Sequence, residues 1–333
     1  MSTPPARRLT AAVATSAALV LTLTACGGDG DGPGDGASGP SGGDGARAAA
    51  THIVATVMGD VKVANVPRRI VVLDTDALDS VVTLGATPVG ATTVAADAPV
   101  STYLPADRLK GVKPVGLIAA PNLEAIAALK PDLILSSKVR DEKNYAALSA
   151  IAPTVFTETT GPSWRQNFAL HAEALGKKPE SDRIAAAYDA HVARLTAALG
   201  GPEKAKKTKV GFVRFVEGAD TRLYLNDTFV GSVFKDLGLG RPANQDRAGF
   251  SLDVSPEQID KADADVLYHS TYGDPAKAKQ TATTASPLWK NLTAVKKGHA
   301  FAVDDNLWML GIGYTGAEKM LDTIEKTYVS AAR

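Results

Sequence analysis

Short apolar runs alternate with amphipathic stretches along most of this chain, and the alternation restricts the possible folds more than any other feature. The runs Ile70–Leu73 and Val210–Val216 have the length and the β-branched content of buried strands. Between such runs lie segments with helical spacing, for example Asp76–Leu84, which is followed by Gly85. Strands that alternate with helices are typical of parallel, doubly wound α/β units. We therefore expect an α/β fold.

The middle of the chain breaks this alternation. Two helical patterns, Ser163–Leu175 and Glu180–Leu199, follow one another with no strand between them. The second has apolar residues close to a 3.6-residue period and ends at a Gly-Gly-Pro sequence, which predicts one long helix. We expect an N-terminal α/β lobe over residues 51–162, a helical bridge over 163–202 and a C-terminal α/β lobe over 203–333. Two lobes of this kind favour a ligand cleft between them.

An internal repeat supports the division into two similar halves. Glu, Ile and Asp recur in both copies at an offset of 133 residues. The two copies are Asn122–Ile126 before Asp132–Leu135, and Ser255–Ile259 before Asp265–Tyr268. In each copy a capping residue is predicted to begin a short helix with a glutamate in its first turn, Glu124 or Glu257. Taken alone, each glutamate is explained by the stabilisation of its own helix start.

The N-terminus has the layout of a secretory signal. Arg7 and Arg8 precede the short apolar run Ala11–Leu23, which is followed by Thr, Ala and Cys26. A signal that ends in Ala and then Cys resembles a bacterial lipobox, in which the cysteine receives a diacylglyceryl group. We expect a lipoprotein signal peptide over residues 1–25, followed by export and anchoring to a membrane surface by acyl chains. The alternative is a signal peptide that happens to contain a cysteine, and the export route, Sec or twin-arginine, stays open.

The segment after the cysteine is predicted to be a tether. Residues 27–46 are mostly Gly, Asp, Ser and Pro, without aromatic or large aliphatic side chains. Such a segment cannot offset its ordering entropy by burial, so we expect a flexible linker over residues 26–50 that begins at the lipidated Cys26. Because Cys26 is the only cysteine, the part of the chain that follows it has neither disulfides nor cysteine metal ligands.

Composition and motifs argue against several classes of protein. Lys and Arg number 36 together, as do Asp and Glu, and this balance does not indicate nucleic-acid binding. From residue 51 onward there is no Gly-x-Ser-x-Gly elbow and no His-Glu-x-x-His motif, so an exported hydrolase is not favoured. A receptor for free zinc or manganese needs converging histidines and carboxylates. The five histidines are instead scattered along the sequence, at His52, His171, His191, His269 and His299.

Several segments together resemble the iron–siderophore substrate-binding lipoproteins of ABC importers. They are the lipobox, the linker, a predicted hairpin over His52–Val63, the sequence Pro67–Leu73, the block Asn122–Leu135 and the long mid-chain helix. The resemblance covers essentially all of Thr51–Arg333. It implies two Rossmann-like lobes joined by a single long α-helix, with a ligand cleft between the lobes and limited hinge motion.

The resemblance implies a membrane-anchored receptor that captures a ferric siderophore and delivers it to ABC permease subunits, without catalysis and without a cofactor of its own. A siderophore already fills the coordination sphere of its iron, so the protein needs no metal ligands. It needs donors for anionic oxygens and apolar surface for the organic scaffold. We expect a monomer at the extracytoplasmic face of the cell membrane. An adhesion module without a small ligand is the alternative from a different class.

Two arginines are the expected donors. Arg140 follows the predicted strand Leu133–Ser136, at the strand end where ligands bind in open α/β sheets. Arg214 lies in the otherwise apolar strand Val210–Val216 and cannot stay buried without a partner. A guanidinium group is permanently charged and offers a fork of donors. Both positions are similar to cleft arginines of the family, whereas the alternative for Arg140 is a solvated pair with a neighbouring carboxylate.

Aromatic residues are expected to cover the organic part of the siderophore. Trp308 lies in a glycine-containing segment that predicts a loop, and similar proteins often place an aromatic residue there. Further candidates are Tyr272, Tyr103 and Trp164. Some members of the family carry a third cleft arginine just after the strand that is Val266–His269 here, where this chain has Ser, Thr and Tyr272. A less cationic cleft favours a hydroxamate siderophore over a highly charged catecholate.

The resemblance also gives the two repeated glutamates a role. An acidic residue on each lobe of such proteins meets arginines on the two permease subunits, and Glu124 and Glu257 are similar in position. A haem-binding receptor of the same fold is the alternative hypothesis for the ligand. In that case His269, at a strand end, and Met309 are the candidate axial ligands.

Overall fold

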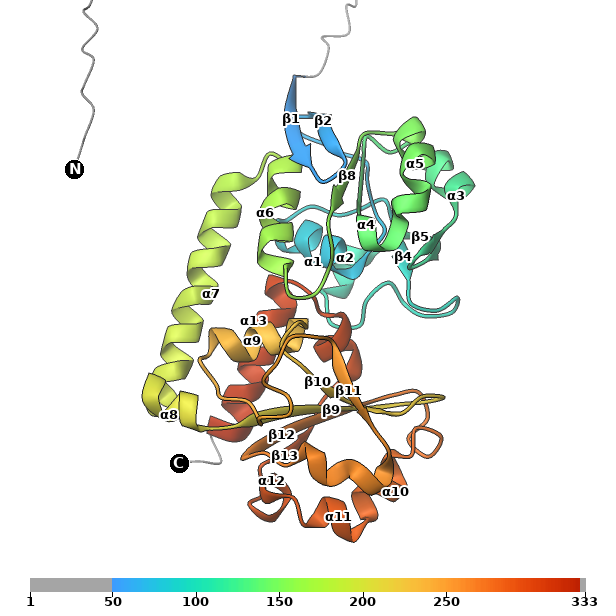
Figure 1. The fold of residues 1–333 in the computed structure, drawn as a ribbon. Coiled ribbons are helices and arrows are strands. Elements are labelled where there is room, and N and C mark those ends of the chain that lie inside the picture. The colour runs from blue at the N-terminus through green and yellow to red at the C-terminus, as the bar shows by residue number, and fades with distance from the viewer. Residues whose placement is uncertain (1–49, 330–333) are drawn as a thin grey trace, which may run out of the picture. The chain divides into compact units, whose positions relative to one another are not determined.

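The computed structural model describes residues 50–329. The predicted signal peptide, Cys26 and all of the predicted linker except Ala50 lie outside the described residues, as do residues 330–333. Within the described range, no helix is at once long enough and apolar enough to cross a membrane. The described residues contain a separate hairpin and two larger sheets, which are flanked by helices (Figure 1).

An antiparallel hairpin opens the described chain, as the sequence predicts. Strands β1 (Thr51–Thr56) and β2 (Gly59–Ala64) pair along their whole length. Gly59 has a φ of 102°, a conformation that glycine adopts without steric cost, and it allows the tight reversal between the strands. β1 packs against α6 (Trp164–Ala174) and β8 (Thr154–Thr157), so the hairpin is tied to the N-terminal lobe.

A six-stranded sheet forms the N-terminal lobe, with the strand order β6-β5-β4-β3-β7-β8. All neighbouring strands are parallel except β5 and β6. The side chains of β3, β7 and β8 are all buried, as expected for strands that are covered on both faces. The strands other than β8 are β3 (Ile70–Val72), β4 (Gly90–Thr93), β5 (Lys113–Leu117), β6 (Ala120–Pro121) and β7 (Leu133–Ser137).

Short helices connect these strands. α1 (Thr75–Thr83) begins at Asp74, whose side chain accepts a hydrogen bond from the backbone N–H of Thr75. Arg140 lies in the short helix that follows β7 rather than in an irregular loop. The remaining helical segments are α2 (Ala106–Leu109), α3 (Leu123–Ala128), α4 (Lys138–Asp141), the 3₁₀ turn η1 (Glu142–Asn144) and α5 (Tyr145–Ile151).

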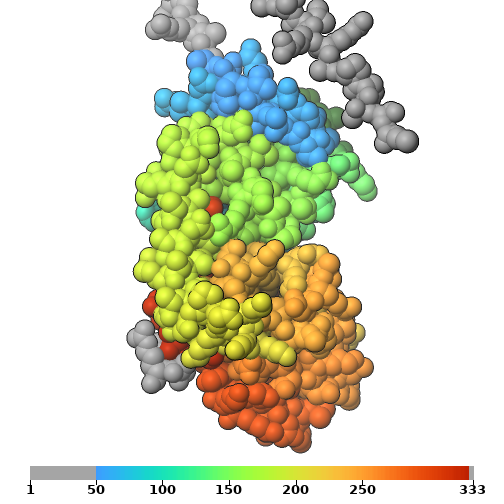
Figure 2. Space-filling model, turned by 60° about the vertical axis from the view of Figure 1, so that its left-hand side comes forward, coloured from blue at the N-terminus to red at the C-terminus, as the bar shows by residue number. Residues whose placement is uncertain are grey.

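Three consecutive helices connect the two lobes. α6 is followed by α7 (Lys178–Ala198), a helix of 21 residues, and by the short α8 (Pro202–Lys207). α7 runs along the surface from the N-terminal lobe to the C-terminal lobe (Figures 1 and 2). It packs against α6 and against α13 (Tyr314–Ile324), which comes from the end of the chain. The long inter-lobe helix that the sequence predicts is therefore present.

A five-stranded sheet forms the C-terminal lobe, with the order β11-β10-β9-β12-β13. β9, β12 and β13 are parallel, but β10 and β11 are antiparallel to their neighbours. The chain passes from β9 to β10 within residues 217–220, which is too short for the crossover that a parallel neighbour requires. The strands are β9 (Val210–Val216), β10 (Thr221–Tyr224), β11 (Ser251–Val254), β12 (Val266–Tyr272) and β13 (Ala300–Ala302).

Helices lie on both sides of this second sheet. α9 and α13 lie on the side of the N-terminal lobe, whereas α10, α11 and α12 lie on the far side (Figure 1). The predicted closing helix over Thr315–Val329 is observed as α13 followed by a π-helical turn. The segments not yet bounded are α9 (Phe229–Asp236), η2 (Pro256–Ala262), α10 (Gln280–Ala285), α11 (Pro287–Lys290), α12 (Thr293–Lys296), η3 (Asn306–Leu310) and η4 (Glu325–Val329).

The two repeated segments occupy equivalent places in the two sheets. The first leads through α3 into β7, and the second leads through η2 into β12, and each strand pairs with the first strand of its lobe. Asp132 accepts hydrogen bonds from the backbone N–H groups of Arg68 and Arg69 at 2.9 and 2.8 Å. Asp265 accepts one from Lys209 at 3.0 Å. The repeated aspartates therefore fasten the neighbouring strand at its start, which explains why they recur.

Candidate ligand-binding cleft

A cavity of about 230 Å³, here called the central cavity, lies between the two lobes. Arg140 and Thr160–Pro162 line it from the N-terminal lobe, and Arg214 lines it from the C-terminal lobe. Two further cavities adjoin it. One of about 540 Å³ shares Arg140 with the central cavity, and one of about 140 Å³ shares Leu310 with it. The apolar wall of the central cavity includes Tyr224, Phe250, Trp308 and Met309.

Arg140 is held at the cavity by a buried carboxylate. Its Nε donates a hydrogen bond to Asp74 Oδ2 at 3.0 Å. The Asp74 side chain is fully buried, whereas 37% of the Arg140 side chain is exposed. Asp74 also accepts from Ser137 Oγ and from the backbone N–H of Thr75, so both of its oxygens are engaged. This buried partner replaces the solvated local pair that was the alternative for Arg140.

Arg214 is held by Asp305 in a two-pronged contact. Its Nε donates to Oδ1 at 2.7 Å and its Nη2 donates to Oδ2 at 2.6 Å. Nη1 lies 3.5 Å from Tyr224 Oη, and the Tyr272 ring lies 5.1 Å from the guanidinium carbon. Ser270, the register partner of Arg214 in β12, donates to Asp305 Oδ1 at 2.7 Å. Burial lowers the pKa of Arg214, but the bonds to Asp305 outweigh burial and raise it, so the arginine stays charged.

The two carboxylates that hold the arginines, Asp74 and Asp305, are not among the site residues predicted from the sequence. Asp74 lies two residues after β3, and Asp305 lies three residues after β13. Both are thus close to the carboxyl end of a strand, which is where ligand-site residues gather in open α/β sheets. The position of an aspartate just after a strand could therefore have identified both residues as candidate site residues. The partner of each carboxylate depends on the order of the strands in the sheet, which the sequence did not show.

Trp308 lines the central cavity but is not an exposed loop residue. It is 1% exposed and lies in the π-helical turn η3, so the predicted loop is wrong. Its ring stacks on Tyr268 and Phe212, with ring centroids 4.7 and 5.5 Å apart, because η3 returns to the apolar face of the second sheet. The indole Nε1 has no acceptor among residues 50–329. An unused donor therefore remains beside the cavity.

Trp164 packs in the core and lines none of the three cavities. It is 1% exposed, and its ring makes edge-on contacts with Tyr188, Phe229 and Tyr314. Its Nε1 donates to Ser232 Oγ at 2.9 Å. The start of α6 meets α7, α9 and α13 at this point, and the large ring fills the space between them. This packing does not place Trp164 in contact with a ligand, contrary to the expectation from the sequence.

Tyr103 also has a different setting from the one expected. It is 8% exposed and lines the cavity of about 140 Å³. Its Oη donates to Asp79 Oδ2 at 3.0 Å, and its carbonyl accepts from Lys319 Nζ in α13. Its polar groups are thus used in the contact between the lobes. Tyr272, by contrast, is 49% exposed and its ring lies against Arg214, but it lines none of the three cavities, so its contact with a ligand stays a prediction.

Asp79 of α1 makes the main polar contact between the lobes. Its buried carboxylate accepts from the backbone N–H groups of Thr315 and Gly316 at 3.2 and 3.1 Å, at the N-terminus of α13, and from Thr83 Oγ1 at 3.0 Å. Burial raises the pKa of Asp79 to about 6, although these donors lower it. A Cβ on Gly313 would collide with Asp79. The positive end of α13 thus meets a carboxylate of the other lobe.

Two more buried titratable groups lie close to these residues. Burial and the neighbouring charge of Asp74 raise the pKa of Asp76 to about 7, and Asn167 Nδ2 donates to its carboxylate at 2.8 Å. Burial lowers the pKa of His171 to about 3, and its Nδ1 bonds to Ser80 Oγ at 2.9 Å. His171 is therefore neutral at physiological pH and takes part in packing between α6 and α1.

Glu124 and Glu257 are both exposed, each in the first turn of its helical segment. Asn122 caps the first segment as predicted, because its side-chain oxygen accepts from the backbone N–H of Ala125 at 3.0 Å. The second segment is a 3₁₀ helix, and its Ser255 does not cap it. The Ser255 side chain instead bonds to Glu257 and lowers the pKa of that carboxyl. A role of the two glutamates in docking stays a prediction.

The two residues expected to ligate haem are not brought together. Met309 lines the central cavity. His269 packs edge-on against Phe215 and Trp289, with ring centroids 6.2 and 5.3 Å apart. Its neighbour Ser270 faces Asp305, so His269 faces the opposite side of the sheet. Burial lowers the pKa of His269 to about 4.

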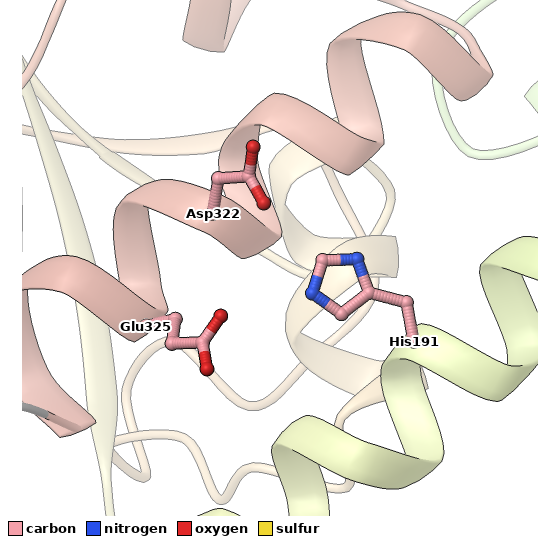
Figure 3. A group of neighbouring side chains, drawn as sticks. All are labelled: His191, Asp322 and Glu325. Atoms are coloured by element: carbon pink, nitrogen blue, oxygen red, sulfur yellow. The ribbon is translucent and has the colours of Figure 1, made fainter.

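One group among the described residues has the spacing of a metal site, although the histidines look scattered in the sequence. His191 of α7, Asp322 of α13 and Glu325 of η4 offer ligand atoms within 4.8 Å of one another (Figure 3). His191 Nδ1 lies 2.5 Å from Glu318 Oε2. None of these residues lines the three cavities of the cleft, and no histidine of residues 50–329 does. The group is thus separate from the cleft.

These features define a class of protein. Two α/β lobes joined by one long helix, with an arginine from each lobe on a shared cavity, are the architecture of a binding protein that holds its ligand between the lobes. The comparison with known families agrees with this class. The chain belongs to the periplasmic binding protein family, whose model matches residues 70–307.

Two curated relatives cover most of this chain. The "Probable siderophore-binding lipoprotein YfiY" of Bacillus subtilis (strain 168) is 43% identical over 275 residues, which are 79% of this chain and 83% of that protein. The "Fe(3+) dicitrate-binding periplasmic protein FecB" of Escherichia coli (strain K12) is 34% identical over 266 residues, which are 78% of this chain and 84% of that protein.

A solved structure agrees with the fold over nearly its full length. The crystal structure of Staphylococcus aureus SirA complexed with staphyloferrin B has a TM-score of 0.74 and 34% sequence identity. The match covers 83% of this chain and 98% of SirA. The two-lobe α/β fold expected from the sequence is thereby confirmed.

Proposed function

We propose that this chain is an extracytoplasmic receptor that captures a ferric siderophore between its lobes and delivers it to an ABC permease. The central cavity carries the proposal, because Arg140 and Arg214 line it from opposite lobes. The names of the relatives support it, since they refer to siderophores or to a ferric citrate complex. The role needs reversible binding only, so we expect no chemical change of the ligand and no cofactor.

The chemistry of the cavity suits an iron complex whose metal is already coordinated. Guanidinium N–H groups donate to the anionic oxygens that surround the iron. Phe250, which lines the cavity and is 53% exposed, offers aromatic surface to the organic scaffold, and the exposed Tyr272 lies beside Arg214. Ligand pockets usually have about 300–1,000 Å³, more than the central cavity alone. We therefore place the ligand across the central cavity and its neighbour of about 540 Å³, with Arg140 at their junction.

The charge balance of the cleft supports a hydroxamate siderophore. Each arginine is paired with one aspartate, so the two pairs carry no net charge. A neutral ferric trihydroxamate loses little on entering such a site. A carboxylate siderophore is the second candidate, because one relative is named for ferric dicitrate, which is anionic. Titration with both classes decides between them.

The N-terminal segment supplies the proposed location. We infer that Cys26 is lipidated and that the Gly- and Asp-rich linker holds the receptor near its permease at a high effective concentration. We also infer that a single receptor docks through Glu124 and Glu257, one on each lobe, with basic residues of the two permease subunits. Cys26→Ser should reduce iron uptake by cells, while the purified protein without its signal peptide keeps its ligand affinity.

Fluorescence titration tests the proposal. Trp308 stacks beside the central cavity, so a ferric complex bound there should quench its emission. Ferrichrome, ferrioxamine, ferric dicitrate, a ferric catecholate and haem are added in turn to the purified protein. Trp164→Phe serves as the matched control, because Trp164 does not line the cavity and its loss should leave the quenching amplitude largely intact. Quenching by haem alone, or by none of the complexes, would refute the proposal.

A further inference from the structure

We propose that Asp74 and Asp305 are specificity-determining residues, which aim the two cleft arginines at the ligand and cancel their charge. The inference rests on the proposed function, because it concerns the ligand that those arginines meet. Neither carboxylate needs to touch the ligand. Each acts through the arginine that it holds, and the pair sets how strongly the cleft prefers neutral over anionic iron complexes.

In the N-terminal lobe, the buried Asp74 carboxylate orients the Arg140 side chain. The Asp74 side chain is fully buried and bonds to Nε of the arginine at 3.0 Å. The bonds of Asp74 to Ser137 and Thr75 prevent the carboxylate from turning. Because only Nε takes part, both terminal amino groups of Arg140 stay outside this contact, and the residue lines two of the cavities.

In the C-terminal lobe, Arg214 is fixed on three sides. Asp305 engages Nε and Nη2, the Tyr272 ring covers one face, and Ser270 fixes the carboxylate. Only 13% of the Arg214 side chain and 12% of the Asp305 side chain are exposed. The remaining group, Nη1, lies 3.5 Å from Tyr224 Oη on the wall of the central cavity. The guanidinium thus cannot swing toward bulk solvent to meet an anion.

The two lobes therefore share one arrangement, in which a charged arginine and its carboxylate form a pair without net charge, and the arginine keeps at least one amino group outside that pair. Donors of this kind still bind ligand oxygens, because a hydrogen bond requires a partial charge only. The long-range attraction that an unpaired arginine exerts on an anion is cancelled by the carboxylate at 2.6–3.0 Å. A cleft built in this way discriminates by charge without a repulsive group at its surface.

The test compares two probes on the same protein. Dissociation constants for ferrichrome, which is neutral, and for ferric dicitrate, which is anionic, are measured by fluorescence quenching at low ionic strength. In Asp305→Asn and in Asp74→Asn, the ratio of the ferric dicitrate constant to the ferrichrome constant should fall about tenfold. That is the effect expected for one unit charge several ångström away at an intermediate dielectric constant. Because both constants come from one preparation, partial unfolding does not change the ratio.

Two control variants distinguish the effect of Asp74 and Asp305 on the cleft arginines from the effect of removing any surface carboxylate. Asp253 also faces an arginine, Arg222, but at 4.0 Å and outside the three cavities, so Asp253→Asn should leave the ratio unchanged. Asp305→Glu restores the charge and should return the ratio toward that of the unmodified protein. An unchanged ratio in both Asp→Asn variants would overturn this inference alone. Failure of the unmodified protein to bind either complex would instead overturn the proposed function and this inference with it.

Discussion

Replacement of Asp79 by asparagine should change how the stability of the fold depends on pH. The Asp79 carboxylate is fully buried at the contact between the lobes, where Tyr103 Oη and the backbone N–H of Gly316 donate to the same oxygen. Burial raises its pKa from 3.8 to about 6. Asparagine keeps the shape of the side chain and one acceptor oxygen, but it does not titrate.

The raised pKa determines the sign of the effect. Between about pH 4 and pH 6, native Asp79 keeps a proton that the unfolded chain has released. The contribution of Asp79 to the free energy of unfolding therefore falls as the pH rises through this window and is constant above it. About two pH units at about 1.4 kcal/mol each give a loss of about 3 kcal/mol. Relative to the unmodified protein, Asp79→Asn should gain about 3 kcal/mol between pH 4 and pH 7.

Urea unfolding followed by tryptophan fluorescence measures this difference at each pH. Subtraction of the two proteins removes the contributions of Asp76 and His171, whose pKa values are also shifted. Tyr103→Phe removes a donor that lowers the pKa of Asp79. In that variant, the pH range over which Asp79 titration changes the free energy of unfolding should extend to higher pH. A difference that stays constant with pH, or that falls as the pH rises, would refute the reasoning. Such a result would mean that the donors and the positive end of α13 outweigh burial.

Three other predictions concern the cleft, the docking residues and the start of α13. Arg140→Gln should weaken binding of the ferric siderophore about tenfold or more in the quenching titration, because a hydrogen bond from a charged donor contributes about 1.5–3 kcal/mol. Glu124→Arg and Glu257→Arg should each reduce iron uptake by cells and leave the affinity of the purified receptor unchanged; a loss of ligand affinity would contradict the docking role. Gly313→Ala should lower the free energy of unfolding by about 2 kcal/mol or more, because its Cβ collides with Asp79.

Much of the fold follows from local patterns in the sequence. The strand Val210–Val216 has the predicted bounds, because it is a short, mostly buried run between clear breaks. β5 was missed because it contains Pro114 and Gly116, which argue against a strand. β11 was missed because its four residues are partly polar. Its pairing with β10 is set by the tertiary fold rather than by a pattern in the chain.

The candidate site was predictable only in part. Arg140 and Arg214 stand out because each is a charged residue in or directly after an apolar strand. Asp305 does not stand out, because its contact with Arg214 crosses β12 and depends on the strand order β9-β12-β13. The burial of Trp164 could not be predicted from the sequence either. It results from the convergence of α7, α9 and α13 on a ring of α6, and the last two of these helices are distant from α6 in the sequence.

The contact between Asp79 and α13 also bears on how far the lobes can move. Only residues 311–313 separate η3, which lines the central cavity, from the start of α13. A wide opening of the cleft would have to pull the first N–H groups of α13 away from the Asp79 carboxylate, and each hydrogen bond to a charged acceptor contributes about 1.5–3 kcal/mol. A rotation that pivots at this contact, with α7 bending little, avoids that cost. The buried aspartate and the helix that it caps thus give a physical reason to expect limited hinge motion, which from the sequence was implied by resemblance alone.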